Sequence, residues 1–294
     1  MIPAHESAAL TVLLRQGHRT PRAYADLLEE TGSALEVLER ELSGGDGQIS
    51  LLPPAREDLI AEAMADIAGW RDRGIRPLTL LDPDYPENLR AVHDRPPLIF
   101  VAGGLDPGDA KSVAVIGSRR ASPAGIDTAR RTAEALVGAG YVVTSGLAAG
   151  IDTAAHAAAL DAGGRTLAVI GTGLNHAYPP RNAELQRRLA RECAVISRFW
   201  PEEPPSRQGF PLRNATMSGV TLGTVIVEAS ATSGTRIQAR QALAHGRPVF
   251  LMSPIESQPW ASELAARPGV YVVDSPAEVI STIERLHGPG ALVG

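Results

Sequence analysis

The chain has 294 residues, of which 44% are hydrophobic and 21% charged, and this composition excludes a disordered or collagen-like protein. Its length is sufficient for one large domain and a small one. Cys193 is the only cysteine, which excludes an intramolecular disulfide and argues against a multi-thiolate metal site. No apolar run approaches the roughly 20 residues that cross a bilayer, and no basic segment precedes the first apolar stretch. We therefore expect a cytoplasmic protein without a membrane partner.

The net charge of −5 is concentrated at the amino-terminal end. Residues 1–76 contain 8 arginines and 13 acidic residues, whereas residues 77–294 carry equal numbers of positive and negative side chains. The acidic total argues against a generically basic nucleic-acid coat protein. The neutral larger part still allows local basic patches.

Apolar residues recur at helical spacing through residues 6–73. Breaks at Gly17, Gly32, the glycine-rich run 44–47 and a Pro-Pro pair divide this stretch. We predict a small, acidic, all-helical domain of about four short helices over residues 1–76.

A proline-rich segment over residues 77–110 follows the helices. It is too apolar for a free linker, and it contains one strand-like run at residues 98–101. We predict an ordered connector that extends the domain after it.

From residue 111, short β-branched runs alternate with helical stretches. The predicted strands are residues 113–116, 142–144, 167–170, 195–196, 225–227, 249–251 and 271–273. Nearly continuous apolar strands separated by helices are typical of a parallel sheet covered on both faces. The predicted fold class is therefore α/β, with an extended Rossmann-like, doubly wound, mostly parallel sheet over residues 111–294.

The first turn after a predicted strand is Gly117-Ser118-Arg119-Arg120, and it leads into a helix. Ligands of doubly wound sheets bind outside the carboxyl ends of the strands. Glycine backbone, helix N–H groups and arginine side chains together favour a phosphate at this turn. A plain strand-to-helix turn with two solvated arginines is an equally good interpretation.

Two further glycine turns follow, one with Gly146 and one with Gly171 and Gly173. The latter begins like a dinucleotide-binding motif but lacks the third glycine and the acidic ribose ligand, so no cofactor is predicted. Asp152 and His156 lie four residues apart, as a metal pair could. A capping carboxylate and a packed histidine are favoured instead, because no third ligand is apparent, and no metal is predicted.

Seven arginines and three aromatic residues lie between Arg181 and Arg213, against four acidic residues. This composition is typical of surfaces that hold a single-stranded backbone and stack bases, although a solvated helix and a proline-rich loop explain it as well. Phe210 is the best stacking candidate, because it lies in a loop leading into a helix. The last turn, with Ser233 and Gly234, can form an anion-binding nest.

Seven short motifs occur in a fixed order along the chain. They are Val115–Arg119, Ser145–Asp152 with His156, Gly171–Leu174, Tyr178–Asn182, Phe210–Asn214, Val227–Ala229 and Ser233–Gly234. In this order and at this spacing, about residues 77–252 resemble the DNA-processing protein A (DprA/Smf) family. The helical amino-terminal domain is similar to the sterile-alpha-motif-like (SAM-like) domain of that family.

The resemblance implies a protein that binds single-stranded DNA without sequence preference and is not an enzyme. It also implies a homodimer that protects incoming single strands during natural transformation and recombination. Such a protein helps to load the RecA recombinase in the presence of single-strand-binding protein.

The resemblance also implies roles for individual residues. Arg119 would hold a phosphate, the backbone of Gly117 and Ser118 would shape its pocket, and Phe210 would contact a base. Arg207 matches a basic family position. The other expected DNA contacts are Arg120, Gly146, Gly171, Gly173, Arg213, Asn214, Ser233 and Gly234.

Two alternatives use the same fold. A nucleoside monophosphate phosphoribohydrolase of the LOG type would need Gly-Gly-x-Gly-Thr-x-x-Glu, but residues 222–228 lack the paired glycines and place the glutamate one residue late. A nucleotide-sensing module stays open. Ala215 replaces a family arginine and residues 253–266 depart from the family pattern, which leaves the strength of DNA binding open. Strand order, host transformability and the RecA and dimer surfaces are open too.

Overall fold

The structure is a computed structural model that describes residues 3–43, 56–229, 234–255 and 258–287. Its first helices are α1 (Ala4–Gln16), α2 (Pro21–Thr31), α3 (Ala34–Leu42) and α4 (Arg56–Asp72). Gly17 and Gly32 end α1 and α2 in the left-handed conformation, and the side chains of Thr20 and Ser33 cap α2 and α3. The predicted helices and these two breaks are confirmed. The predicted breaks at 44–47 and 53–54 lie outside the described residues.

The predicted parallel strands are also confirmed. They are β3 (Ser112–Gly117), β4 (Val142–Ser145), β5 (Thr166–Val169), β6 (Ala194–Ser197), β7 (Thr224–Glu228), β8 (Val249–Met252) and β9 (Val270–Val273). Within the described ranges they belong to one nine-stranded sheet of order β1-β2-β6-β5-β4-β3-β7-β8-β9. The α/β fold class with preceding helices is therefore confirmed, and the strand order that the sequence left open is resolved.

The connector contributes two strands rather than one. β2 (Leu98–Gly103) was expected, whereas β1 (Ile75–Thr79), which contains Pro77, was not. β1 lies at the edge of the sheet, where proline costs no ladder hydrogen bond on the open side. β2 pairs antiparallel with both β1 and β6. β1 begins before the predicted boundary at residue 76, and the division into three domains stays a prediction.

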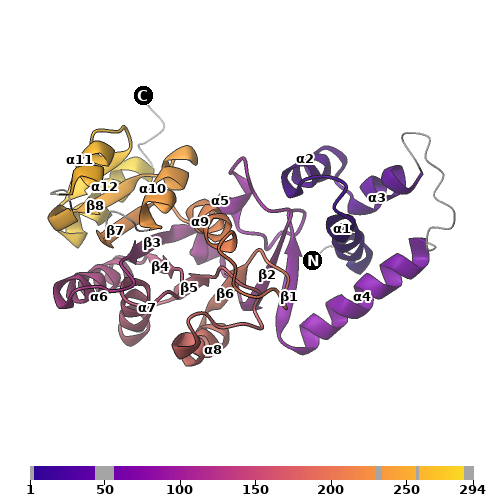
Figure 1. Ribbon diagram of the computed structural model, residues 1–294, viewed down its shortest axis with the longest axis horizontal. Helices are drawn as coiled ribbons and strands as arrows, with labels where there is room; N and C mark the ends of the chain where they lie inside the picture. Colours follow the sequence, from indigo (N-terminus) through magenta and orange to yellow (C-terminus); the bar gives the residue numbers. More distant parts are fainter. Residues whose placement is uncertain (1–2, 44–55, 230–233, 256–257, 288–294) are drawn as a thin grey trace.

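Helices cover both faces of the sheet, as Figure 1 shows. The remaining helices are α5 (Glu87–Arg90), α6 (Pro123–Gly138), α7 (Ile151–Asp161), α8 (Ala183–Glu192), α9 (Gly209–Val220), α10 (Thr235–Ala244), α11 (Pro259–Ala265) and α12 (Pro276–His287), with 3₁₀ turns at Pro107–Lys111, Pro180–Asn182 and Ser253–Ile255. Alternate strand residues enter different cores, so Val115 packs with α6 and α7 while Ile116 packs with α9 and α10.

The amino-terminal helices pack against the β1–β2 end of the sheet (Figure 1). The Trp70 ring of α4 lies 5.1 Å from the Phe100 ring of β2 and 5.9 Å from the Trp200 ring. This aromatic cluster joins the helices to the sheet. No helix among the described residues is long and apolar enough to cross a membrane.

Candidate nucleic-acid interface

A pocket of about 560 Å³ lies at the carboxyl ends of the central strands. β3 and β7 are neighbours there, and the chain leaves them toward opposite sides of the sheet, which is the switch point where doubly wound folds bind ligands. The turn after β3, the helix α9 and the first turn of α10 line it. The predicted site residues along its wall are Gly117, Ser118, Arg119, Arg120, Phe210, Arg213, Asn214 and Gly234.

A second pocket of about 250 Å³ adjoins the first and shares Arg119, Arg120, Phe210 and Arg213 with it. Its other lining residues include the predicted site residues Gly146 and Gly171, together with Tyr178 and Arg181. The turns after β3, β4 and β5 therefore converge on one surface, as their place at the strand ends predicted.

Phe210 lies between the two pockets and has cationic and aromatic neighbours. The guanidinium carbon of Arg119 lies 5.0 Å from the centre of the Phe210 ring, and the Tyr178 ring centre lies 5.7 Å away. A Cβ on Gly171 would lie 3.1 Å from Phe210 Cδ1, so a side chain at this turn would press on the ring. Phe210 was expected in a loop but lies in the first turn of α9.

The Arg213 side chain is buried beneath the surface that the two pockets share. It is 7% exposed, and its guanidinium donates to the carbonyls of Gly146 and Val169 and to Asn214 Oδ1, at 2.7, 3.0 and 2.9 Å. Burial lowers the pKa of Arg213, while the charge of Asp152 opposes that change. A Cβ on Gly146 would overlap the guanidinium group, which explains the glycine. Arg213 is therefore a buried cation beneath the surface on which Arg119 is exposed.

Asp152 is the acidic residue among those lining the large pocket. It was expected to cap its helix, but its carboxylate accepts from the loop N–H groups of Gly146 and Ala148, at 3.2 and 3.3 Å. Desolvation raises its pKa, and Arg213 counteracts the shift. Asp152 thus fixes the β4–α7 loop against the buried arginine.

His156 is a packed histidine, as predicted. It is fully buried in α7, and its Nδ1 lies 2.7 Å from Thr166 Oγ1. Burial lowers its pKa to about 3, so the folded protein keeps this side chain neutral in weakly acidic solution.

The depressed pKa of His156 predicts a loss of stability in acid. Below pH 6.5 the His156 side chain is protonated in the unfolded chain but stays neutral in the folded chain. The free energy of unfolding therefore falls as the pH is lowered toward about 3. From pH 7 to pH 5, urea unfolding of the wild type should lose about 2 kcal/mol more than that of His156→Gln. The exposed-site variant His5→Gln should follow the wild type. Equal losses in all three proteins would contradict the assignment.

The amino terminus of α6 already has an anionic partner. Glu228, at the end of β7, accepts hydrogen bonds from the N–H and hydroxyl of Ser122, the N-cap of α6. The sequence predicted that N–H groups at the start of this helix bind a phosphate, but those of Ser122 and Gly125 already donate to Glu228 and to the Ser122 hydroxyl. At this turn, a phosphate would meet the side chains of Arg119 and Arg120 instead.

The arginines between 181 and 213 have different environments. Arg187, Arg188 and Arg191 form ion pairs with acidic residues of α8. Arg213 is buried and Arg198 is half-buried. Within the part of the chain that the structure describes, Arg119, Arg120, Arg181 and Arg207 are exposed and make no ion pair. The basic surface is therefore smaller than the composition suggested.

Three predicted residues lie outside both pocket walls or outside the described residues. Gly173 does not line either pocket, because it packs under the Trp200–Pro201 backbone and its N–H donates to the Glu203 carbonyl at 2.8 Å. Arg207 is exposed on the loop before α9 and lines neither pocket. Ser233 lies outside the described residues, so its role stays a prediction.

Gln238 of α10 was missed by the sequence analysis. It is 1% exposed and lines the large pocket, yet neither its amide nitrogen nor its amide oxygen has a hydrogen-bond partner in the described structure. A buried amide without partners is costly in a folded protein unless a ligand or water completes it. The only sequence signal was its position one turn after Gly234, where the sequence predicted an anion-binding nest.

Known proteins of similar sequence support one family. The family model described as DNA recombination-mediator protein A matches residues 76–284. DNA processing protein DprA of Streptococcus pneumoniae is 42% identical over 172 residues, which cover 58% of this chain and 61% of the relative. DprA of Bacillus subtilis is 33% identical over 196 residues, 66% of each chain, and protein Smf of Escherichia coli is 39% identical over 207 residues, 68% of this chain and 54% of the relative. The chain thus aligns with less than two thirds of each of these relatives.

Solved structures agree with the sequence matches. The crystal structure of DNA processing protein A from Streptococcus pneumoniae has a TM-score of 0.71 and 30% identity, and covers 95% of this chain and 98% of that one. The solved structure of DNA processing protein A from Helicobacter pylori has a TM-score of 0.63 and 23% identity, covers 72% of this chain and 96% of that one, and shows the common fold. These matches confirm the resemblance seen in the motifs, and the chain belongs to the DNA recombination-mediator protein A (DprA/Smf) family of DNA processing proteins.

Proposed function

We propose that this protein binds single-stranded DNA with little sequence preference, along the surface that joins the two pockets. The observation that carries this proposal is the exposed Arg119 guanidinium over the face of Phe210, at the rim of a pocket with a buried cation. A cation and a ring side by side offer one group for a phosphate and another for a base. The Helicobacter pylori relative, which binds single-stranded DNA, adds support from within the family.

Single-stranded rather than duplex DNA fits the shape of this surface. The pockets are concave and the aromatic ring lies at their junction, where a base can reach it only if it is not paired within a duplex. Contacts to phosphate and to the π-face of any base carry little sequence information. Tyr178, 44% exposed beside Phe210, provides a second ring for the next base.

We also propose that the pocket is a binding site and not a catalytic one. Its acidic residue, Asp152, accepts two loop N–H bonds and is 4% exposed. Glu228 lies one residue after the position that the phosphoribohydrolase motif requires for its glutamate. Its carboxylate accepts a hydrogen bond from the Ser122 N–H at the start of α6. Neither carboxylate is free to serve as a general base toward a ligand.

Affinity for a labelled oligonucleotide, measured as single strand and as duplex across a salt series, tests this function. The expected result is a preference for the single strand and an affinity that falls steeply with salt, because phosphate contacts release counterions. A pocket of about 560 Å³ also fits a small molecule, so a panel of mononucleotides should be tested by thermal unfolding. Stabilisation by mononucleotides without binding of oligonucleotides would replace this proposal by the nucleotide-sensor alternative.

Gln238 gives this site a residue-level test. Gln238→Met keeps the side-chain volume and removes two polar atoms that have no protein partner, so the free energy of unfolding should stay unchanged or rise. If the amide binds a base, single-strand affinity should fall by about 1 kcal/mol. Urea unfolding and oligonucleotide titration measure the two effects. Lower stability with unchanged affinity would show a structural amide instead. Gln241→Met, further along the same helix, is the comparison for a structural amide, because it removes the hydrogen bond that Gln241 donates to the Pro211 carbonyl at 2.8 Å and should lower stability.

We further propose that the protein acts as a homodimer that helps to load RecA onto strands covered by single-strand-binding protein. The family's description as a mediator of DNA recombination supports this step. Light scattering should give twice the chain mass. RecA filament assembly on covered strands should accelerate when the protein is added, and an unchanged assembly rate would contradict the loading role.

A further inference from the structure

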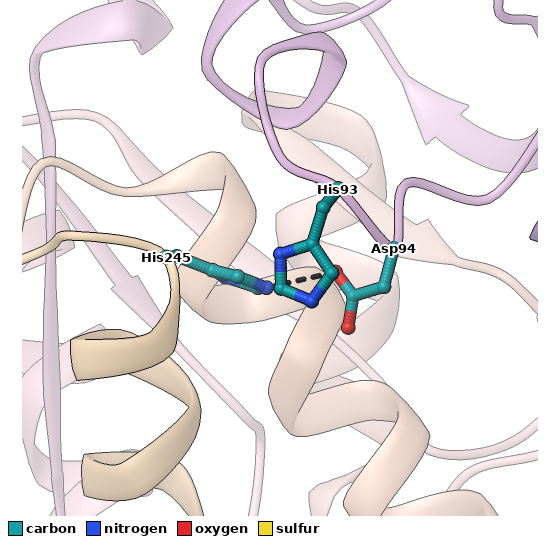
Figure 2. A group of neighbouring side chains, drawn as sticks. All are labelled: His93, Asp94 and His245. Atoms are coloured by element: carbon teal, nitrogen blue, oxygen red, sulfur yellow. Dashed lines mark hydrogen bonds and ion pairs between the residues drawn. The ribbon is translucent and has the colours of Figure 1, made fainter.

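His93, Asp94 and His245 form a cluster away from the pockets (Figure 2). His93 and Asp94 lie in the loop between α5 and β2, whereas His245 follows the last residue of α10, 151 positions after Asp94. One potential ligand atom of each residue lies within 4.8 Å of the other two. Two imidazoles and a carboxylate are a ligand set typical of zinc.

Ser218 fixes the orientation of the His245 ring. The Ser218 hydroxyl lies 3.0 Å from the Ala215 carbonyl, to which it can donate, and 2.8 Å from His245 Nδ1. In the tautomer that donates from Nδ1 to this hydroxyl, the lone pair of Nε2 is directed toward Asp94 and is open to a metal ion. Histidines that bind metals are held in this way, with the second ring nitrogen donating to a neighbour.

A metal ion can replace the hydrogen bond between His245 and Asp94. Nε2 of His245 lies 2.7 Å from Asp94 Oδ1, and the His245 side chain is 1% exposed. The ring binds a metal ion through Nε2 when its own proton is on Nδ1 and directed to Ser218, and the ion then lies between Nε2 and Asp94 Oδ1.

His93 completes the site from the solvent side. Its ring lies edge-on to that of His245, with the ring centres 5.4 Å apart, and its side chain is exposed. Ligand atoms around tetrahedral zinc lie about 3.3 Å apart, given bonds of about 2.0–2.2 Å. The three ligand atoms lie within 4.8 Å of one another and the His93 side chain is exposed, so binding the ion would draw His93 and the Asp94 loop closer to it.

We propose that His93, Asp94 and His245 bind one zinc ion, with water as the fourth ligand. The ion joins the loop after α5 to the end of α10, whose first turn lines the large pocket. The site is thus a cross-link between two segments far apart in the sequence, and it does not depend on DNA binding.

The test is a titration of the chelator-stripped full chain with Co²⁺ and Zn²⁺. Co²⁺ should give the visible absorption of a tetrahedral site at one equivalent, and Zn²⁺ should displace it and raise the melting temperature. His93→Ala leaves the Ser218–His245–Asp94 contacts intact and should weaken Co²⁺ binding by at least about tenfold. His5→Ala, which removes an exposed histidine of α1, should bind like the wild type.

Two results would overturn the site. The first is no Co²⁺ absorption in the wild type, which would leave a proton between His245 and Asp94. The second is equal binding by the wild type, His93→Ala and Asp94→Asn, which would place the ion elsewhere.

Discussion

Replacing Phe210 by alanine is expected to weaken single-strand binding by about 1–3 kcal/mol, which is the range measured for lost base stacking. The ring is half-buried in the first turn of α9, with Arg119 on its face and Tyr178 beside it. Alanine removes the stacking surface and the partner of the Arg119 guanidinium together. Titration of a labelled single strand measures the loss.

Two further variants separate stacking from charge. Phe210→Trp keeps a π-face and should keep most of the affinity, whereas Phe210→Leu should behave like alanine. Arg119→Ala should also weaken binding and should lower the slope of log affinity against log salt by about one. Because Arg119 and Phe210 are in contact, their losses should not simply add. Unchanged affinity in both alanine variants would remove this surface from the DNA site.

Replacing Arg213 by methionine is expected to lower the free energy of unfolding by about 3–5 kcal/mol. The substitution leaves the carbonyls of Gly146 and Val169 without their donor. It also leaves Asp152 buried without the neighbouring cation that counteracts the rise of its pKa. A buried charge that has lost its partner destabilises the fold by more than the intact ion pair stabilises it. The expected loss is therefore large. Urea unfolding at pH 7 measures it.

The matched control is Arg120→Met, an exposed arginine of the same pockets, which should change stability by less than about 0.5 kcal/mol. Combining Arg213→Met with Asp152→Asn removes the uncompensated charge and should recover part of the loss. A loss in Arg213→Met no larger than in the control would contradict the structural role and return Arg213 to the set of direct phosphate contacts.

The sequence by itself determined the parallel strands, the helices and the edge of the sheet at which the two pockets lie. The strands were readable because a buried parallel strand is a short run of apolar residues, as in residues 113–116. The helix ends at Gly17 and Gly32 were readable because left-handed caps favour glycine. The turns after β3, β4 and β5 were known to lie at one edge before any contact was known, because parallel strands share a direction.

β1 was not predicted from the sequence, and it contains a proline, Pro77. Pro77 argues against a strand in the centre of a sheet, but at an edge its missing N–H costs nothing. Which strand is at the edge follows from the order of all nine strands in the described sheet, and no local pattern encodes it.

Only the tertiary structure decided which side chains meet. Glu228 occupies the start of α6, Gln238 reaches the pocket with its amide unpartnered, and His245 comes to His93 and Asp94. Periodicity and capping depend on neighbours within about one turn of chain, so the sequence carries them locally. Contacts such as that of His245 with Asp94 depend on strand order and helix packing, which the whole chain sets together.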